Sequence, residues 1–331
     1  MNYSMSTKES NFLPKAPLKS IGIIITCKLM NTRLFDMKKK TEVKNNGSRS
    51  NLTDISKSGD KTKEKFQKHL DKPYISKNYI GTDKLFDKVA LITGGDSGIG
   101  RAVAIHFARE GAHVAIVYLQ SDEDAIETKY LVENEGVKCM LIRGDIRKPA
   151  FCKNTIHKVY KKFKNIDILV NNAGIHEESP AINDIEPDQL QKTFAVNIFP
   201  LFYFTQAALK YMKPGGVIIN TASVVAYRGS DHLLDYSASK GAVVTFTRSL
   251  AQNLAKKKIR VNGVAPGPIW TPLVVHAFDK SHLEKFGKDT SLKRAGYPQE
   301  VAPAYVWLAS NESSYITGQM IHVNGGEIIN G

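Results

Sequence analysis

A chain of 331 residues allows one large domain or two modest ones, and 42% hydrophobic with 24% charged residues is ordinary for a soluble globular protein. The three cysteines, Cys27, Cys139 and Cys152, form no Cys-x-x-Cys pair, which argues against a disulfide framework or a zinc site and favours a reducing, cytoplasmic setting. The net charge of +14 would suggest a nucleic-acid partner if it covered the fold, but most of it lies in one terminal segment.

Residues 1–84 contain 18 Lys and Arg against 8 Asp and Glu, so they carry +10 and the remaining 247 residues only +4. The segment has little periodicity and too few apolar residues to offset the entropy of ordering a chain. We therefore expect a basic, mostly disordered N-terminal extension whose removal up to residue 80 leaves the fold and the activity largely unchanged. No nucleic-acid partner is expected, because the few aromatic residues do not interleave with the charges. The stretch Pro73–Phe86 is the most apolar part and the best suited to lie along the folded body.

The apolar patch Ile21–Cys27 is far shorter than the roughly 20 residues that cross a bilayer, so we predict no membrane span. A signal peptide has little support, since no clear small-residue cleavage site follows the patch. A transit peptide stays open, because the first 35 residues are basic and nearly free of acids. Met37 heads the basic run MKKK and is a hypothetical alternative start of the chain.

A single domain is predicted over residues 85–331, and it begins with a nucleotide-binding pattern. The short apolar run Lys88–Thr93 is typical of a buried parallel strand. It leads into the glycine-rich turn Thr93–Gly100 and then into the amphipathic stretch RAVAIHFAREGA. Gly94, Gly98 and Gly100 would let the backbone approach a pyrophosphate, which the free N–H groups at the start of the helix then bind.

The end of the second strand, His113–Leu119, is where an acidic residue would bind the ribose 2′-hydroxyl of NAD. Tyr118, Leu119 and Gln120 occupy this region instead. No arginine stands at the strand tip to bind the 2′-phosphate of NADP. The preference between the two cofactors therefore stays open.

Strands and helices then alternate to the end of the chain, which predicts an α/β fold with a doubly wound parallel sheet of about seven strands and helices on both faces. The further strands are expected at 139–145, 166–174, 216–223, 259–267 and 320–325. The helices are expected at 122–135, 149–164, 188–211, 236–257 and 299–309.

Tyr236 and Lys240 are four residues apart in a stretch with helical periodicity, so they share one helix face. A cation beside a phenol favours the phenolate and lowers the tyrosine pKa, as acid–base catalysis near neutral pH requires. Ser223 ends a buried strand and would lie at the edge of the sheet. A second Tyr-x-x-x-Lys pair, Tyr160 and Lys164, lies in a basic run and is more simply a solvated helix face.

Residues 85–331 resemble the single-domain short-chain dehydrogenase/reductase family, and within it the general-stress and glucose/ribitol dehydrogenase-like subgroup. The resemblance rests on motifs in family order, and it leaves out the N-terminal extension. These motifs are Thr93–Gly100, Asp145-Ile146, Asn171–Gly174, Asn197, Ser223, the Tyr236/Lys240 pair and Pro266-Gly267.

The resemblance implies an NAD(P)-dependent oxidoreductase that interconverts an alcohol and a carbonyl, the substrate being a sugar, a polyol or a small aldehyde or ketone. The resemblance implies that Tyr236 is the general acid/base and that Lys240 is the cation that lowers its pKa and bonds the nicotinamide ribose. It also implies that Ser223 binds and polarises the substrate oxygen and that Asn197 holds a relay water. The implied cofactor-binding residues are Gly94, Ser97, Gly98, Ile99, Gly100, Asp145, Ile146, Asn172, Ala173, Gly174, Tyr236, Lys240, Pro266, Gly267, Ile269 and Thr271.

The span Ile269–Asp289 lies where the family has a mobile lid. Four histidines attract attention in the chain: His176, His232, His276 and His282. The first two follow strand ends that should face the cleft and could touch substrate, although a surface or loop histidine is the simpler interpretation for each. No metal-ligand spacing links the four, so we predict no metal.

The main alternative is a dinucleotide-binding sensor or scaffold that kept the fold without turnover. The presence of both Tyr236 and Lys240 argues against it. An epimerase or dehydratase would need a larger C-terminal region. The family resemblance also implies a homotetramer.

Overall fold

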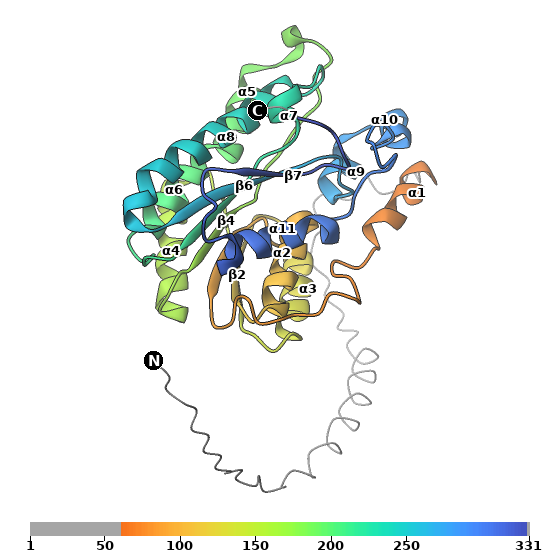
Figure 1. The fold of residues 1–331 in the computed structure, drawn as a ribbon. Coiled ribbons are helices and arrows are strands. Elements are labelled where there is room, and N and C mark those ends of the chain that lie inside the picture. Colours follow the sequence, from red (N-terminus) through yellow and green to blue (C-terminus); the bar gives the residue numbers. More distant parts are fainter. Residues whose placement is uncertain (1–60, 330–331) are drawn as a thin grey trace, which may run out of the picture. The chain divides into compact units, whose positions relative to one another are not determined.

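The computed structural model describes residues 61–329, and their centre is a seven-stranded sheet in the order β3-β2-β1-β4-β5-β6-β7 (Figure 1). All neighbouring strands are parallel, which confirms the predicted doubly wound α/β class. Strands β1, β4 and β5 are buried along their whole length, because helices cover both faces. The strands are β1 (Val89–Thr93), β2 (His113–Tyr118), β3 (Cys139–Arg143), β4 (Ile168–Asn171), β5 (Val217–Thr221), β6 (Arg260–Pro266) and β7 (Met320–Val323).

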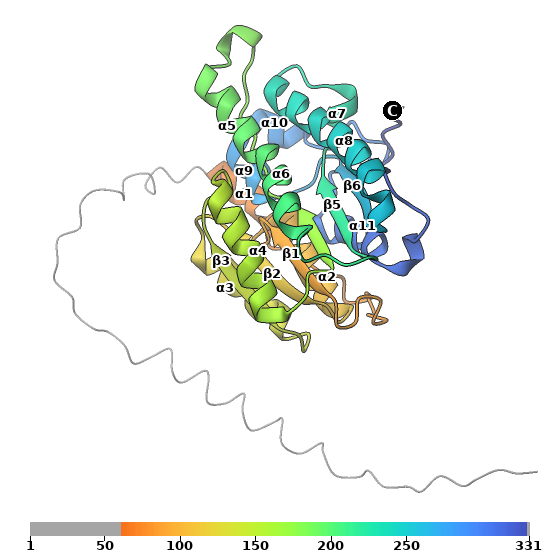
Figure 2. The same cartoon turned by 90° about the vertical axis from the view of Figure 1, so that its left-hand side faces the viewer.

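Each face of the sheet has its own apolar core. Helices α2, α3 and α11 close one face, around Phe107 and Tyr305. Helices α4, α6 and α8 close the other, around Phe204 and Leu254, and α5 packs against α6 and α8 (Figure 2). The helices are α1 (Lys61–Leu70), α2 (Gly98–Arg109), α3 (Asp122–Glu133), α4 (Pro149–Phe163), α5 (Pro187–Asn197), α6 (Phe199–Ala208), α7 (Val225–Arg228), α8 (Leu234–Leu254), α9 (Pro272–Ala277), α10 (Lys280–Lys285) and α11 (Pro298–Ala309).

The helix predicted over Asp188–Tyr211 is divided in the structure. Its two parts, α5 and α6, meet at Ile198, whose φ of −121° and ψ of −55° lie outside the helical region. Pro200 explains the break, since it has no N–H to donate and its ring would collide with the carbonyl four residues earlier. The break leaves Asn197 as the last residue of α5, where its side chain reaches the segment that follows β4.

Strand order fixes where a ligand can bind. Strand β1 lies between β2 and β4. The chain adds β2 and β3 on one side of β1 and then crosses to add β4 to β7 on its other side, so the strand order reverses between β1 and β4. In open parallel sheets, such a switch point leaves a crevice at the carboxyl ends of the strands. The turns that follow β1 and β4 carry the predicted glycine turn and the predicted Asn172–Gly174 motif, so both motifs meet at one edge of the sheet.

The segment 61–84 belongs to the folded domain, so the predicted boundary between residues 84 and 85 lies too late. Helix α1 packs against α9 and α10 (Figure 1), and its Phe66 is only 4% exposed. His69 stacks on Trp270 with 4.3 Å between ring centroids. Farther along, the Tyr79 hydroxyl donates to Glu110 at 2.6 Å. The extension from Lys61 on is therefore a packed part of the domain.

The other predictions for the N-terminal extension concern residues 1–60. The patch Ile21–Cys27, the transit peptide and the alternative start at Met37 all lie outside the described residues. Within residues 61–329, none of the helices has the length and hydropathy needed to cross a membrane.

Candidate active site

A cavity of about 1340 Å³ opens at the carboxyl ends of the strands. Pockets for single drug-sized ligands measure roughly 300–1000 Å³, so this cavity has room for a dinucleotide and a small substrate together. Most of the predicted site residues line it, but Gly100 and Asn197 do not. Those in the lining are Gly94, Ser97, Gly98, Ile99, Asp145, Ile146, Asn172, Ala173, Gly174, Ser223, Tyr236, Lys240, Pro266, Gly267, Ile269 and Thr271.

The glycine turn needs its glycines for two different reasons. Gly94 and Gly98 have φ of +62° and +52°, a backbone conformation that other residues adopt at a cost. A Cβ on Gly100 would lie 1.9 Å from the Gly94 carbonyl oxygen, so Gly100 lets α2 approach the turn from beneath. Ser97 precedes α2 without capping it through its side chain. The Ser97 side chain thus does not occupy the first N–H groups of α2, which fits a bound pyrophosphate at this helix end.

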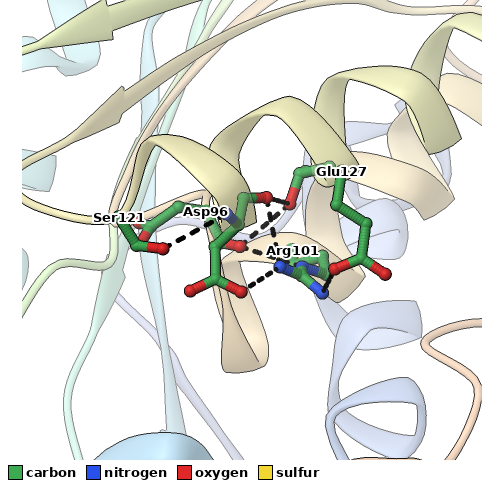
Figure 3. A network of polar contacts seen from close by, with 6 residues as sticks. Asp96, Arg101, Ser121 and Glu127 are labelled. Atoms are coloured by element: carbon green, nitrogen blue, oxygen red, sulfur yellow. Dashed lines mark hydrogen bonds and ion pairs between the residues drawn. The ribbon is translucent and has the colours of Figure 1, made fainter. Parts of the chain in front are cut away.

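A network of ion pairs and hydrogen bonds around the buried Arg101 supports the glycine turn (Figure 3). Arg101, 4% exposed, donates to the carbonyl of Asp96 at 2.8 Å. Its guanidinium also pairs with Glu127 at 2.6 Å and with Asp124 at 2.9 Å, both on α3. Thr128 donates to the same Asp96 carbonyl at 2.9 Å. The network fixes the turn to α3, so the position of the turn depends on residues that lie far along the chain.

The segment after β4 is locked to the same turn. The side chain of Asn172 donates to the carbonyls of Thr93 and Gly94, both at 3.1 Å. The Thr93 hydroxyl accepts the backbone N–H groups of Asn172 at 2.9 Å and Ala173 at 3.1 Å. The two predicted motifs thus form one hydrogen-bonded unit, and Ala173 and Gly174 follow it along the cavity wall.

Asp145 also lines the cavity, and it accepts hydrogen bonds from the side chain of Arg147 at 2.8 Å and from its backbone N–H at 2.9 Å. This pairing lowers the pKa of Asp145. Tyr118, at the tip of β2, donates to Asp122 at 2.7 Å. Arg147 lines the cavity beside Ile146 and the residues after β2. The sequence showed no arginine at the strand tip, whereas the fold brings one from the loop after β3.

Tyr236, Lys240 and Ser223 come together on the cavity wall. The Lys240 amine lies 5.5 Å from the centroid of the Tyr236 ring. Lys240 is 3% exposed and donates to the carbonyl of Thr221 at 2.8 Å. Ser223 follows β5, and its hydroxyl is hydrogen-bonded to the Tyr236 phenol. The arrangement places a phenol, an ammonium group and a hydroxyl at one point of the cavity.

Burial sets the protonation of this pair. It raises the pKa of Tyr236 to about 12, although the hydrogen bond from Ser223 acts in the opposite direction. It also lowers the pKa of Lys240 to about 8. Burial of the phenol therefore acts against the predicted lowering of its pKa by the cation, and the role of Lys240 in that lowering stays a prediction. Near pH 7 the pair is a neutral phenol beside an ammonium group.

Asn197 lies behind the cavity wall and holds the segment after β4. Its Oδ1 accepts the backbone N–H of Ile175 at 2.9 Å, and its Nδ2 donates to the Ile175 carbonyl at 2.9 Å and to Ser239 at 3.0 Å. A Cβ on Gly174 would lie 3.3 Å from both Asn197 Oδ1 and the Lys240 amine. The amide and the amine therefore approach the same point of the backbone.

Two buried contacts support the site but were not foreseen. The hydroxyl of Tyr305, on α11, lies 2.7 Å from that of Thr221, whose carbonyl accepts from Lys240. Asp235, 3% exposed, accepts from Thr193 at 2.7 Å and from the backbone N–H of Tyr236 at 2.7 Å. The position of Asp235 directly before Tyr236 was the only available sequence signal. These contacts hold the start of α8 and the end of β5 in place.

His176 is packed against the candidate catalytic tyrosine. Its ring lies 5.3 Å from that of Tyr236, edge to face, and 5.2 Å from that of Phe278. Burial and the charge of Lys240 lower the pKa of His176 to about 4, so it is neutral at physiological pH. Its Nδ1 is buried without a partner among the described residues. Two more of the predicted histidines line the cavity, namely His232 and His282.

The other Tyr-x-x-x-Lys pair has no such surroundings. Tyr160 stacks on Tyr211 with 4.3 Å between ring centroids, and Lys164 is an exposed residue at the end of α4. Neither residue lines the cavity. The interpretation as a helix face away from the site agrees with these positions.

A nucleotide-sized cavity at a Rossmann switch point, with a glycine turn at one end and a Tyr–Lys–Ser group at the other, defines a dinucleotide-dependent oxidoreductase fold. The family model described as Enoyl-(Acyl carrier protein) reductase matches residues 94–327. The chain belongs to the short-chain dehydrogenase/reductase family, whose members use NAD or NADP.

The relatives place the chain in the predicted subgroup. It is 53% identical to general stress protein 39 of Bacillus subtilis, over 77% of this chain and 90% of that protein. It is 50% identical to the NADPH-dependent aldehyde reductase 1, chloroplastic, of Arabidopsis thaliana, over 78% and 92%. It is 46% identical to the glucose and ribitol dehydrogenase of Daucus carota, over 80% and 94%. The crystal structure of a short-chain dehydrogenase from Burkholderia cenocepacia in complex with NADP is 33% identical, with a TM-score of 0.70 over 73% of this chain and 98% of that one.

Proposed function

We propose that this protein uses NAD or NADP to interconvert an alcohol and a carbonyl, with Tyr236 as the general acid/base. One observation carries the proposal: Tyr236, Lys240 and Ser223 lie together in the cavity whose other end is formed by the glycine turn. A cofactor that extends from that turn would bring its reactive ring toward the phenol. The cofactor supplies the hydride when it is bound, so the protein has to provide orientation and a proton.

The side chains divide this work. Ser223 donates a hydrogen bond to the substrate oxygen and holds it beside Tyr236. In reduction, the neutral phenol gives its proton to that oxygen as the carbonyl becomes an alcohol. The ammonium of Lys240 stabilises the phenolate left behind, and solvent protons reach it through the region between Lys240 and Asn197. Oxidation of an alcohol uses the same groups in reverse.

The substrate class we propose is a sugar, a polyol or a small aldehyde or ketone. The names of two relatives, an aldehyde reductase and a glucose and ribitol dehydrogenase, support this range. The lining near Tyr236 also supports it, since it combines the apolar Phe278 with polar His232 and Ser230. Such a wall suits a short carbon chain that bears hydroxyl groups.

The pKa directions predict a pH profile for carbonyl reduction. Tyr236 keeps its proton well above neutral pH, so the acid is present throughout the usual range. Lys240, whose pKa is lowered to about 8, loses its charge above that pH. We expect kcat/KM for reduction to be flat from about pH 6 to 7.5 and to fall up to tenfold per unit above pH 8. A flat profile up to pH 10 would show that the charge of Lys240 is not needed.

We further propose that the protein is a cytoplasmic homotetramer. The buried free thiols of Cys139 and Cys152 support a reducing compartment. Phe199 and Phe202, on α6, are 45% and 43% exposed, and the Phe202 ring lies 4.4 Å from Phe246 on α8. This apolar patch supports an interface between subunits that includes α8. Light scattering of the purified protein measures the assembly.

The experiment for the proposed function is a spectrophotometric screen of sugars, polyols, aldehydes and ketones with NAD, NADP and their reduced forms. We expect turnover of at least one hydroxylated or short-chain compound with one cofactor preferred. If the reduced cofactor binds and no compound in the panel is converted, the protein is a dinucleotide sensor or scaffold instead.

A further inference from the structure

Two histidines of the cavity lining, His232 and His282, meet the glutamate Glu178. Glu178 follows β4, His232 precedes α8, and His282 lies on α10 within the lid span. Their ligand atoms lie within 4.8 Å of one another, and they form the one group of this kind among residues 61–329. His232 and His282 line the cavity, so the group faces the same space as Tyr236. The sequence could not reveal the group, because its members lie on three distant segments.

The distances within the group are those of a nearly formed metal site. The Glu178 carboxylate lies 3.1 Å from Nδ1 of His282 and 3.7 Å from Nε2 of His232. Zinc bonds of about 2.0–2.1 Å in tetrahedral geometry separate neighbouring ligand atoms by about 3.3 Å. Both distances from the Glu178 carboxylate oxygen to a histidine nitrogen lie near this value. The two imidazole rings have centroids 4.7 Å apart, and their ligand nitrogens lie within 4.8 Å of each other, so binding of a metal ion would have to draw these nitrogens together.

A second carboxylate already orients one of the ligands. Nδ1 of His232 lies 2.7 Å from the Asp231 carboxylate, which leaves Nε2 to face Glu178. Carboxylate–histidine pairs of this kind fix the tautomer and the ring direction of metal ligands. His282 is held by its backbone as well, since its N–H donates to Asp279 at 2.8 Å, the cap of α10. Asp231 and Glu178 together carry two negative charges to oppose a divalent cation.

We propose that Glu178, His232 and His282 bind a divalent transition-metal ion, best matched by Zn²⁺, at the wall of the cavity. Two imidazoles and one carboxylate suit zinc, whereas Mg²⁺ and Ca²⁺ require oxygen ligands. With three protein ligands, the ion keeps a fourth position for water or an oxygen of a ligand in the cavity. The ion joins the segments before α8 and after β4 to helix α10 of the lid.

An aromatic stack connects this site with the catalytic tyrosine. The ring of Phe278 lies parallel to that of His282, with centroids 4.5 Å apart and an angle of 10°. Phe278 contacts His176, which in turn contacts the Tyr236 ring. A bound ion therefore holds α10 and Phe278 over the space beside Tyr236. This consequence for catalysis rests on the proposed function, whereas the binding of the metal does not.

The test titrates Zn²⁺ into tag-free, chelator-stripped protein by calorimetry and measures bound metal by mass spectrometry. We expect one Zn²⁺ per chain. Glu178→Gln and His282→Gln should each weaken binding about 100-fold or more, and Asp231→Asn about 10- to 100-fold. His276→Gln is the matched control, because His276 is an exposed lid histidine whose Nδ1 bonds the Pro272 carbonyl instead. It should bind as the parent does.

A parent protein that binds no stoichiometric Zn²⁺ at 100-fold molar excess would overturn the proposal, and so would a Glu178→Gln variant that binds it like the parent. Glu178→Gln keeps the size of the side chain, so a folded variant is expected even if His282→Gln unfolds. Limited proteolysis within residues 269–289 gives a second readout: Zn²⁺ should slow cleavage in the parent and not in His282→Gln. Zinc binding without any dehydrogenase activity would refute the proposed function and leave the metal site standing.

Discussion

Replacing Tyr236 by Phe should lower kcat for carbonyl reduction by about 10²- to 10⁴-fold, the usual contribution of a positioned acid–base group. The variant loses only the hydroxyl, and the ring still packs against His176. Lys240 keeps its hydrogen bond to the Thr221 carbonyl, so the cofactor end of the site should stay in place. Cofactor affinity is therefore expected to change by less than about threefold. Steady-state kinetics and a fluorescence titration with the reduced cofactor measure the two quantities.

The matched control for this variant is Tyr160→Phe. Tyr160 has a lysine four residues later, as Tyr236 does, but it stacks on Tyr211 away from the cavity. It should keep the parental kcat. Retained turnover in Tyr236→Phe, or an equal loss in Tyr160→Phe, would reject Tyr236 as the acid/base.

Removal of residues 1–80 should destabilise the domain, whereas removal of residues 1–59 should not. The shorter deletion keeps α1. The longer deletion removes Phe66 from the apolar cluster that it forms with Trp270 and Phe278, and it also removes the hydrogen bond from Tyr79 to Glu110. Burial of one Phe contributes about 1.5–3 kcal/mol and an aromatic contact about 0.5–1.5 kcal/mol. For a domain of this size the melting temperature should fall by roughly 5 °C or more. Differential scanning calorimetry of both deletions checks this expectation.

This expectation replaces the one drawn from the sequence, in which removal up to residue 80 had little effect. A point variant, Phe66→Ala, separates the packing of α1 from the loss of the chain before it, and it should show about half of the decrease. Equal melting temperatures for the two deletions would mean that α1 contributes nothing to the stability of the domain.

The fold could be predicted because buried parallel strands are short, apolar and separated by amphipathic helices, and this pattern survives without any knowledge of packing. Helix α1 was missed because KTKEKFQKHL has Phe66 and Leu70 as its only large apolar side chains, and their burial depends on a surface formed some 200 residues later. The break at Ile198 was missed although Pro200 offered a signal for it.

The glycine turn, Ser223 and the Tyr236/Lys240 pair could be located from motifs in family order, whereas the Tyr-x-x-x-Lys spacing by itself also fits Tyr160 and Lys164. The protonation of the pair could not, because it depends on how completely the fold removes water from Tyr236 and Lys240. The group of Glu178, His232 and His282 had no spacing to reveal it, since three separate segments bring its members together. The roles of the site residues in binding and turnover remain predictions that the variants test.

The most direct test of the account is a single-turnover experiment on the protein saturated with its preferred reduced cofactor. Once binding is complete, an aldehyde from the screen is added, and the absorbance of the reduced cofactor is followed in the parent and in Tyr236→Phe. We predict that the parent consumes one cofactor per active site, and that the variant binds the cofactor equally well but consumes it at least 100-fold more slowly. Consumption at the same rate in both proteins would contradict the account.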